Sequence, residues 1–102
     1  MNILNQRGAL AEEIASLHFL RRGYFVFRPI MGFGPVDIVA LNEDGDILLL
    51  DIKTEKKRLL HDRLTPTRIT RKRTILQKFL GVHICYVDIE NESVFLSNHA
   101  AN

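Results

Sequence analysis

Three residues of the chain have the types and the spacing that metal-assisted hydrolysis of a phosphodiester would require. Asp37 lies near the start of one apolar segment, and Asp51 and Lys53 lie at the end of the next. Two neighbouring carboxylates repel each other unless a cation joins them, and oxygen ligands with open water positions suit magnesium or manganese. Such an ion activates water and polarises a phosphoryl oxygen, while the Lys53 ammonium complements the developing negative charge.

The pattern of the two segments predicts that the carboxylates meet. Residues 42–46 are rich in turn-forming types and predict a hairpin between two strands. If Leu41 pairs with Ile47, the same antiparallel register pairs Asp37 with Asp51. A buried carboxylate is costly unless it is paired or bound to a metal, so two of them at one place favour a metal site.

A salt bridge at a strand end is the alternative interpretation of the Asp-x-Lys triplet. Many strands end in charged residues that simply meet water, and Asp51 with Lys53 fits that description too. The triplet follows four consecutive apolar residues, however, and the preceding strand opens with Pro-x-Asp. This combination is more specific than the triplet alone, and it favours the metal site.

The first half of the chain is predicted to fold as one helix and three strands. Apolar residues at helical spacing predict a helix over 10–20, which Gly23 ends. Runs of branched and aromatic residues predict strands over 24–28, 36–41 and 47–53. The third strand is apolar at four consecutive positions, so we expect it to be covered on both faces.

The second half is predicted to begin with a basic, irregular segment over 54–64. Thr65 is suited to cap a following helix with Pro66 in its first turn, and Gly81 is suited to end it. The inner stripe of this helix is expected at its apolar positions, namely Ile69, Ile75, Leu76, Phe79 and Leu80.

The chain is expected to close with a strand over 82–87, a turn over 88–92 and a shorter strand over 93–96. Residues 97–102 are expected to form a flexible tail. The order of elements predicts an α/β fold with a mixed central sheet flanked by helices, the last helix being a crossover. A length of 102 residues fits one domain over 1–102.

The positive charge of the chain is concentrated in one segment. Residues 53–78 hold ten of the fourteen basic residues and two of the twelve acidic ones, so this segment carries +8 and the rest carries −6. Such a local excess is typical of a surface that binds a polyanion such as nucleic acid. A solvated helix face is the alternative for any single cation.

Composition excludes several other classes of protein. A hydrophobic fraction of 46% argues against disorder, and the single cysteine, Cys85, excludes an internal disulfide and is expected to be a buried core thiol. No stretch approaches the roughly 20 apolar residues that cross a bilayer, and the N-terminus lacks the layout of a signal peptide. We therefore expect a soluble, cytoplasmic protein.

Residues 34–40 (GPVDIVA) and 48–54 (LLLDIKT) resemble the signature of the PD-(D/E)xK nuclease superfamily. Residues 7–12 (RGALAE) are similar to the N-terminus of archaeal Holliday-junction resolvases and related small bacterial and phage nucleases. The resemblance covers about half of the chain. It implies a restriction-endonuclease-like αβββαβ core and Mg²⁺-dependent phosphodiester hydrolysis, with Mn²⁺ expected to substitute.

The resemblance also assigns roles to individual residues. The implied catalytic residues are Glu12, Asp37, Asp51 and Lys53. Asp37, Asp51 and the main-chain carbonyl of Ile52 would hold the metal, with Glu12 close to it directly or through water. Lys53 would be the catalytic lysine.

Two positions are less clearly assigned. Periodicity does not separate Glu12 from Glu13, and an acid early in a helix is also favoured by the helix dipole. Asp51 stands where the resolvases usually carry Glu, which shortens the arm that would reach the metal.

The resemblance further bears on residues expected to contact nucleic acid. Arg28 resembles a phosphate-contacting position of the resolvases. Arg68 stands where some relatives carry Gln, and it is either a phosphate or leaving-group contact or a surface residue. The full expected set is Arg28, Lys56, Lys57, Arg58, Arg63, Arg68, Arg71 and Lys72.

The sequence thus predicts a metal-dependent endodeoxyribonuclease that acts on duplex DNA or on a branched or structured form. A homodimer is expected, because one small site cannot cut two strands at once. The alternatives are a non-catalytic DNA-binding module on the same fold and a subunit of a larger restriction or repair complex.

Overall fold

The computed structural model describes residues 3–55, 57–59, 66–68 and 72–97, and for residues 3–5, 57–59 and 66–68 it describes the backbone alone. Its elements, in chain order, are α1 (Ile3–Leu20), β1 (Phe25–Phe27), β2 (Ile38–Leu41), β3 (Ile47–Thr54), β4 (Lys57–Leu59), β5 (Pro66–Arg68), α2 (Ile75–Leu80), β6 (His83–Asp88) and β7 (Ser93–Leu96). None of the helices in this part of the chain has the length and apolarity that a bilayer crossing requires.

The strands form a mixed sheet in the order β1-β2-β3-β6-β7, with a separate two-stranded sheet made by β4 and β5. Neighbours are antiparallel except β3 and β6, which run parallel. A parallel pair needs a crossover connection, and α2 lies within it. The predicted fold class, a mixed α/β sheet fold, is confirmed.

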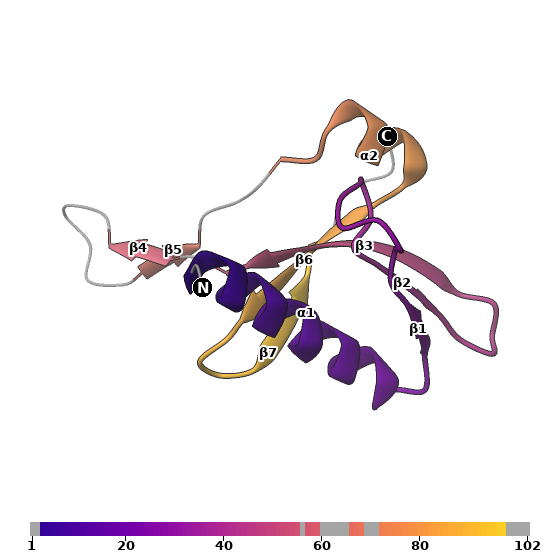
Figure 1. Cartoon of the computed structure of the whole chain (residues 1–102), viewed down its shortest axis with the longest axis horizontal. Coiled ribbons are helices and arrows are strands. Elements are labelled where there is room, and N and C mark those ends of the chain that lie inside the picture. The colour runs from indigo at the N-terminus through magenta and orange to yellow at the C-terminus, as the bar shows by residue number, and fades with distance from the viewer. Residues whose placement is uncertain (1–2, 56, 60–65, 69–71, 98–102) are drawn as a thin grey trace.

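Helix α1 lies across one face of the sheet and contacts all five of its strands (Figure 1). Its buried face consists of Ala11, Ala15 and Phe19, which pack against buried residues of β2, β3 and β6 such as Leu50 and Cys85. Cys85 is a core thiol, as predicted, and burial raises its pKa to about 12. This helix-on-sheet core is what holds β2 and β3 in place.

Helix α1 begins earlier than the predicted span over 10–20. Its first turns, from Ile3 onward, lack apolar periodicity but also lack a strong helix breaker. Propagating an existing helix adds one hydrogen bond per residue, so the single glycine in this stretch, Gly8, does not stop it. An ion pair at 3.5 Å between Arg7 and Glu90 joins this end of the helix to the turn before β7.

The second helix does not start at Thr65, so the prediction of its position is wrong. Pro66 lies in β5, which pairs with β4, so the segment predicted to be irregular holds part of a hairpin instead. A proline is tolerated in a two-stranded ribbon because each strand has an unpaired edge. Helix α2 begins at Ile75, where Thr74 and Gln77 form a reciprocal capping box, and Gly81 ends it as predicted, with a φ of 78°.

The predicted inner stripe of this helix is also wrong. Ile75 and Phe79 are 87% and 85% exposed, and Leu76 and Leu80 are exposed as well. The residue of α2 that is buried is Gln77, at 6% exposure. A helix of six residues is too short to present a full apolar stripe to a sheet. Ile69 lies outside the described residues.

One face of β3 is consequently less covered than predicted. Leu50 is fully buried beneath α1, whereas Leu49 on the opposite face is half-buried and Ile47 is exposed. The expectation of a strand covered along both faces is therefore wrong for its first half. The opposite face becomes buried only further along, at Asp51, where α2 approaches β3. Of the predicted tail over 97–102, only Ser97 lies within the described residues.

Candidate active site

Asp37 and Asp51 are brought together by the β2–β3 hairpin. Ile38 pairs with Leu50 and Leu41 with Ile47, which confirms the predicted register. Asp37 lies just before β2, and its main-chain N–H donates to the carbonyl of Leu50 at 2.7 Å, which holds it against β3 beside the residue that precedes Asp51.

The turn that closes this hairpin is built on Asn42. Its Oδ1 accepts from the main-chain N–H groups of Asp44 and Asp46, at 3.0 and 2.9 Å. Gly45 takes a φ of 88°, which a residue without Cβ adopts at no cost. A turn fixed in this way holds the register that aligns the two carboxylates at the far end of the strands.

The surroundings of Asp37 raise its pKa to about 6. Burial is the largest cause, and a hydrogen bond with the Asp51 carboxyl group and the charges of Asp51 and Glu12 act in the same direction. The main-chain N–H of Ile52, which donates to Asp37 Oδ2 at 2.7 Å, opposes them. The two carboxyl groups are thus close enough to influence each other, and a positive charge near them would relieve their repulsion.

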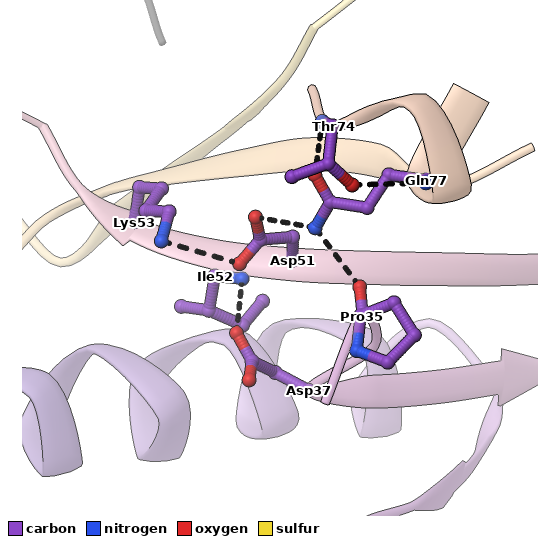
Figure 2. Close-up of polar contacts among 7 residues, drawn as sticks. All are labelled: Pro35, Asp37, Asp51, Ile52, Lys53, Thr74 and Gln77. Atoms are coloured by element: carbon purple, nitrogen blue, oxygen red, sulfur yellow. Dashed lines mark hydrogen bonds and ion pairs between the residues drawn. The ribbon is translucent and has the colours of Figure 1, made fainter. Parts of the chain in front are cut away.

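Asp51 is only 9% exposed and has a different partner at each oxygen. Its Oδ1 lies 3.5 Å from Lys53 Nζ, and its Oδ2 accepts from Gln77 Nε2 at 2.9 Å (Figure 2). The ion pair expected from the salt-bridge interpretation therefore exists. A simple salt bridge at a strand end does not, however, explain why a second carboxyl group, that of Asp37, lies beside it.

Gln77 is the residue of this cluster that sequence reasoning missed. A signal was present, because Thr74-x-x-Gln77 has the pattern of a capping box at a helix start. Thr74 Oγ1 accepts from the Gln77 main-chain N–H at 3.1 Å, and Gln77 Oε1 accepts from the Thr74 main-chain N–H at 3.0 Å. The capping box places the Gln77 side chain at the first turn of α2, from which its amide reaches Asp51.

These groups line one side of an open cleft of about 440 Å³. Its lining residues are Phe33, Gly34, Asp37, Asp51, Lys53, Lys72, Thr74 and Gln77. Lys72, predicted to contact nucleic acid, is exposed and lines the same cleft as the acids. Two carboxylates and two ammonium groups therefore share a cavity that is open to solvent.

Glu12 and Glu13, which periodicity could not separate, have different surroundings. Glu13 Oε1 forms an ion pair with Arg28 at 3.0 Å, whereas the charge of Glu12 contributes to the raised pKa of Asp37. Glu12 is therefore the helix acid that acts on the site electrostatically.

Within the described ranges, no three His, Cys, Asp or Glu side chains gather as a metal cage. Asp37 and Asp51 are the pair whose oxygens offer ligands. Glu12 lies outside such a close trio.

Arg28 bonds to α1. Its Nη2 donates to Ser16 Oγ at 2.7 Å and to the Glu12 carbonyl at 3.1 Å, in addition to the ion pair with Glu13. The guanidinium thus fastens the end of β1 to the middle of the helix. This anchoring contact was not predicted, and the predicted phosphate contact of Arg28 stays a prediction.

The remaining predicted nucleic-acid contacts lie in the basic segment. Lys56, Arg63 and Arg71 lie outside the described residues. Lys57 and Arg58 belong to β4 and Arg68 to β5, for which the backbone alone is described. Their roles stay predictions.

Comparison with known proteins supports the fold. No protein-family model matches the chain, and no curated protein sequence matches it. Among solved structures, the chain is similar to a bacterial homing endonuclease, I-Ssp6803I, with a TM-score of 0.62 and 16% sequence identity over 91% of this chain and 67% of that chain. At this identity the likeness is one of fold.

Proposed function

We propose that the chain is a metal-dependent endodeoxyribonuclease that hydrolyses phosphodiester bonds. The observation that carries this proposal is the pairing of Asp37 with Asp51, with Lys53 beside them, in a solvent-open cleft. The similarity of the fold to a homing endonuclease supports it. So does the resemblance of both strands to the PD-(D/E)xK signature.

Mg²⁺ is the proposed cofactor, with Mn²⁺ able to replace it. The residues present fit such an ion, because magnesium is usually held by one or two carboxylates together with water. Asp37, Asp51 and the main-chain carbonyl of Ile52 would be the ligands, and Glu12 would act through a bound water. When bound, the ion supplies an activated water and a charge that polarises the phosphoryl oxygen.

The protein's own cations would orient the phosphate. Lys53 Nζ lies beside Asp51 Oδ1, and Lys72 lines the same cleft. A fixed ammonium near the reacting phosphate stabilises the negative charge that develops on its oxygens. The excess charge of +8 over residues 53–78 would add backbone contacts, so binding to DNA should weaken as salt rises.

A duplex or branched DNA is the proposed substrate, by analogy with the resolvases that the N-terminus resembles. The experiment is a cleavage screen with Mg²⁺, Mn²⁺ or EDTA on linear duplex, four-way-junction and single-stranded DNA. We expect metal-dependent nicking that Lys53→Ala removes. Cleavage that persists in EDTA, or in Lys53→Ala, would contradict the proposal.

A non-catalytic DNA-binding module and a subunit of a larger complex are the alternatives on the same fold. The pair of acids together with a lysine argues against the first, since binding alone needs no clustered carboxylates. Salt-sensitive DNA binding without cleavage under any metal would favour it. Cleavage that appears only when a partner protein is added would favour the second.

We also propose a homodimer. Its support is the exposed apolar surface of α2, at Ile75 and Phe79, together with Ile30 and Phe33 of the β1–β2 loop. Exposed apolar side chains such as these are candidates for a subunit interface, and a dimer would supply a second active site for the second strand. Analytical ultracentrifugation tests it, and a monomer at all concentrations with and without DNA would contradict it.

A further inference from the structure

The side chain of Gln77 connects three separate segments of the chain. Its Nε2 donates to Asp51 Oδ2 in β3 at 2.9 Å and to the carbonyl of Pro35, before β2, at 3.0 Å (Figure 2). Its Oε1 accepts from Thr74 at the start of α2, at 3.0 Å. A single buried amide therefore joins α2 to β3, which carries Asp51, and to the segment before β2, which carries Asp37.

The orientation of this amide is determined by its partners. Nε2 faces two acceptors, a carboxylate and a carbonyl, while Oε1 faces a main-chain donor. The reversed amide would place an oxygen against two oxygens and an NH₂ group against an N–H. Gln77 is thus held in one rotamer, with every polar atom of its side chain paired.

A neutral donor has a particular effect on Asp51. A second cation in this place, in addition to Lys53, would compete further with a metal for the negative charge of Asp51, whereas an amide adds no charge. The amide engages Oδ2, whereas Oδ1 has the Lys53 ammonium 3.5 Å away and no hydrogen bond from Gln77. Partners of this kind orient the groups that bind a metal directly.

We propose that Gln77 is a positioning residue, which fixes the Asp51 carboxylate through Oδ2 so that Oδ1 is presented as the metal ligand. This inference rests on the proposed function, because it concerns the same metal. It also assigns a role to α2. The exposure of Ile75 and Phe79 shows that this short helix is not held by an apolar stripe, and Gln77 joins it to Asp51.

Binding of Mn²⁺ to the full chain tests the proposal, measured by calorimetry and by electron paramagnetic resonance. Gln77→Met keeps the side-chain length but removes the donor. Gln77→Glu keeps the acceptor for the Thr74 N–H, and hence the capping box, but sets a third carboxylate against Asp51. Loss of a partner that orients a metal ligand usually costs about tenfold to hundredfold in metal affinity. We expect a loss of that size in both variants.

Asn91→Asp is the matched control. Asn91 Nδ2 also donates to a carboxylate, Asp88 Oδ2, at 2.8 Å, but in the exposed turn after β6. The same amide-to-acid change there should leave Mn²⁺ affinity unchanged. Far-ultraviolet circular dichroism of each variant checks that the fold is retained, and Gln77→Glu keeps the experiment informative if Gln77→Met does not fold.

The outcomes separate this proposal from the one on which it rests. If the wild-type protein binds Mn²⁺ and both Gln77 variants bind it equally well, the positioning role is overturned while the metal site stands. If the wild-type protein binds no Mn²⁺, both the proposed metal site and the positioning role of Gln77 are contradicted. Weaker binding in both variants, with Asn91→Asp unchanged, supports the role.

Discussion

The carboxyl groups of Asp37 and Asp51 interact across the open end of the β2–β3 hairpin, and burial together with this neighbouring acid raises the pKa of Asp37 to about 6. Two interacting carboxylates repel each other, so Asp37 keeps its proton to a higher pH when no cation is present. The same place that favours a proton at low pH would favour a divalent cation at neutral pH. We therefore expect the stability of the protein and the binding of a metal to be coupled at this pair.

The metal-free protein should lose stability as the pH rises. The folded pKa of Asp37, about 6, lies above the ordinary value of 3.8, so the folded state holds the proton more tightly than the unfolded state does. The proton on Asp37 therefore adds to the free energy of unfolding. This stabilisation is fully present below pH 3.8 and is lost as the pH rises through 6. Thermal unfolding in EDTA between pH 4 and 7 measures it.

Asp37→Asn should remove the loss of stability with rising pH, because a neutral amide mimics the protonated acid. Its Tm at pH 7 should be higher than that of the wild type, while cleavage is abolished. Asp44→Asn, in the exposed hairpin turn, is the control and should change neither. A lower Tm for Asp37→Asn than for the wild type at pH 7 would show that the ionised Asp37 does not destabilise the fold at neutral pH.

Divalent cations should stabilise the wild-type protein at pH 7. A ligand that binds only the folded state at 100 times its Kd adds about 2.7 kcal/mol to the free energy of unfolding. We expect Mg²⁺ or Mn²⁺ to raise the Tm of the wild type but not that of Asp37→Asn or Asp51→Asn. Equal shifts in all three proteins would place the cation elsewhere.

Lys53→Met should separate catalysis from folding. The ion pair with Asp51 spans 3.5 Å, and Lys53 is 39% exposed, so its loss should cost no more than about 1 kcal/mol of stability. Removing a group that stabilises charge in the transition state usually costs about 10²–10³ in kcat. Single-turnover cleavage and urea unfolding measure the two effects. A variant as active as the wild type would exclude Lys53 from the chemistry.

Arg28→Ala tests the anchoring contact on α1. It removes hydrogen bonds to Ser16 Oγ and to the Glu12 carbonyl together with the ion pair to Glu13, so we expect a loss of about 1–3 kcal/mol in urea unfolding. Fluorescence anisotropy with duplex DNA asks whether affinity falls as well. Unchanged stability with weakened DNA binding would instead support the predicted phosphate contact.

The acid pair could be predicted from sequence because its causes are local. Alternation along two strands and a turn built on Asn42 are enough to pair Ile38 with Leu50, which brings the next residues, Asp37 and Asp51, to the same end of the hairpin. The second helix could not be placed in this way. Thr65 before Pro66 and Thr74 before Gln77 are both plausible starts. The choice depends on pairing between β4 and β5 and on contacts made by Gln77.

The role of Gln77 could not be predicted from local sequence patterns, because its partners are distant in sequence. Its partner Pro35 lies 42 residues away in sequence, and Asp51 lies 26 residues away. A glutamine on a helix otherwise rich in apolar residues is normally assigned to the solvent side. Its burial depends on acceptors that only the folded sheet brings to it.

The most direct test of the central claim is a crystal soaked in Mn²⁺ and examined by anomalous diffraction. A metal-dependent site built on Asp37 and Asp51 predicts an anomalous peak between their carboxylates, within coordination distance of both. The same soak of Asp37→Asn should show no peak there. A wild-type crystal with fully occupied Mn²⁺ at other positions and none between Asp37 and Asp51 would contradict the account.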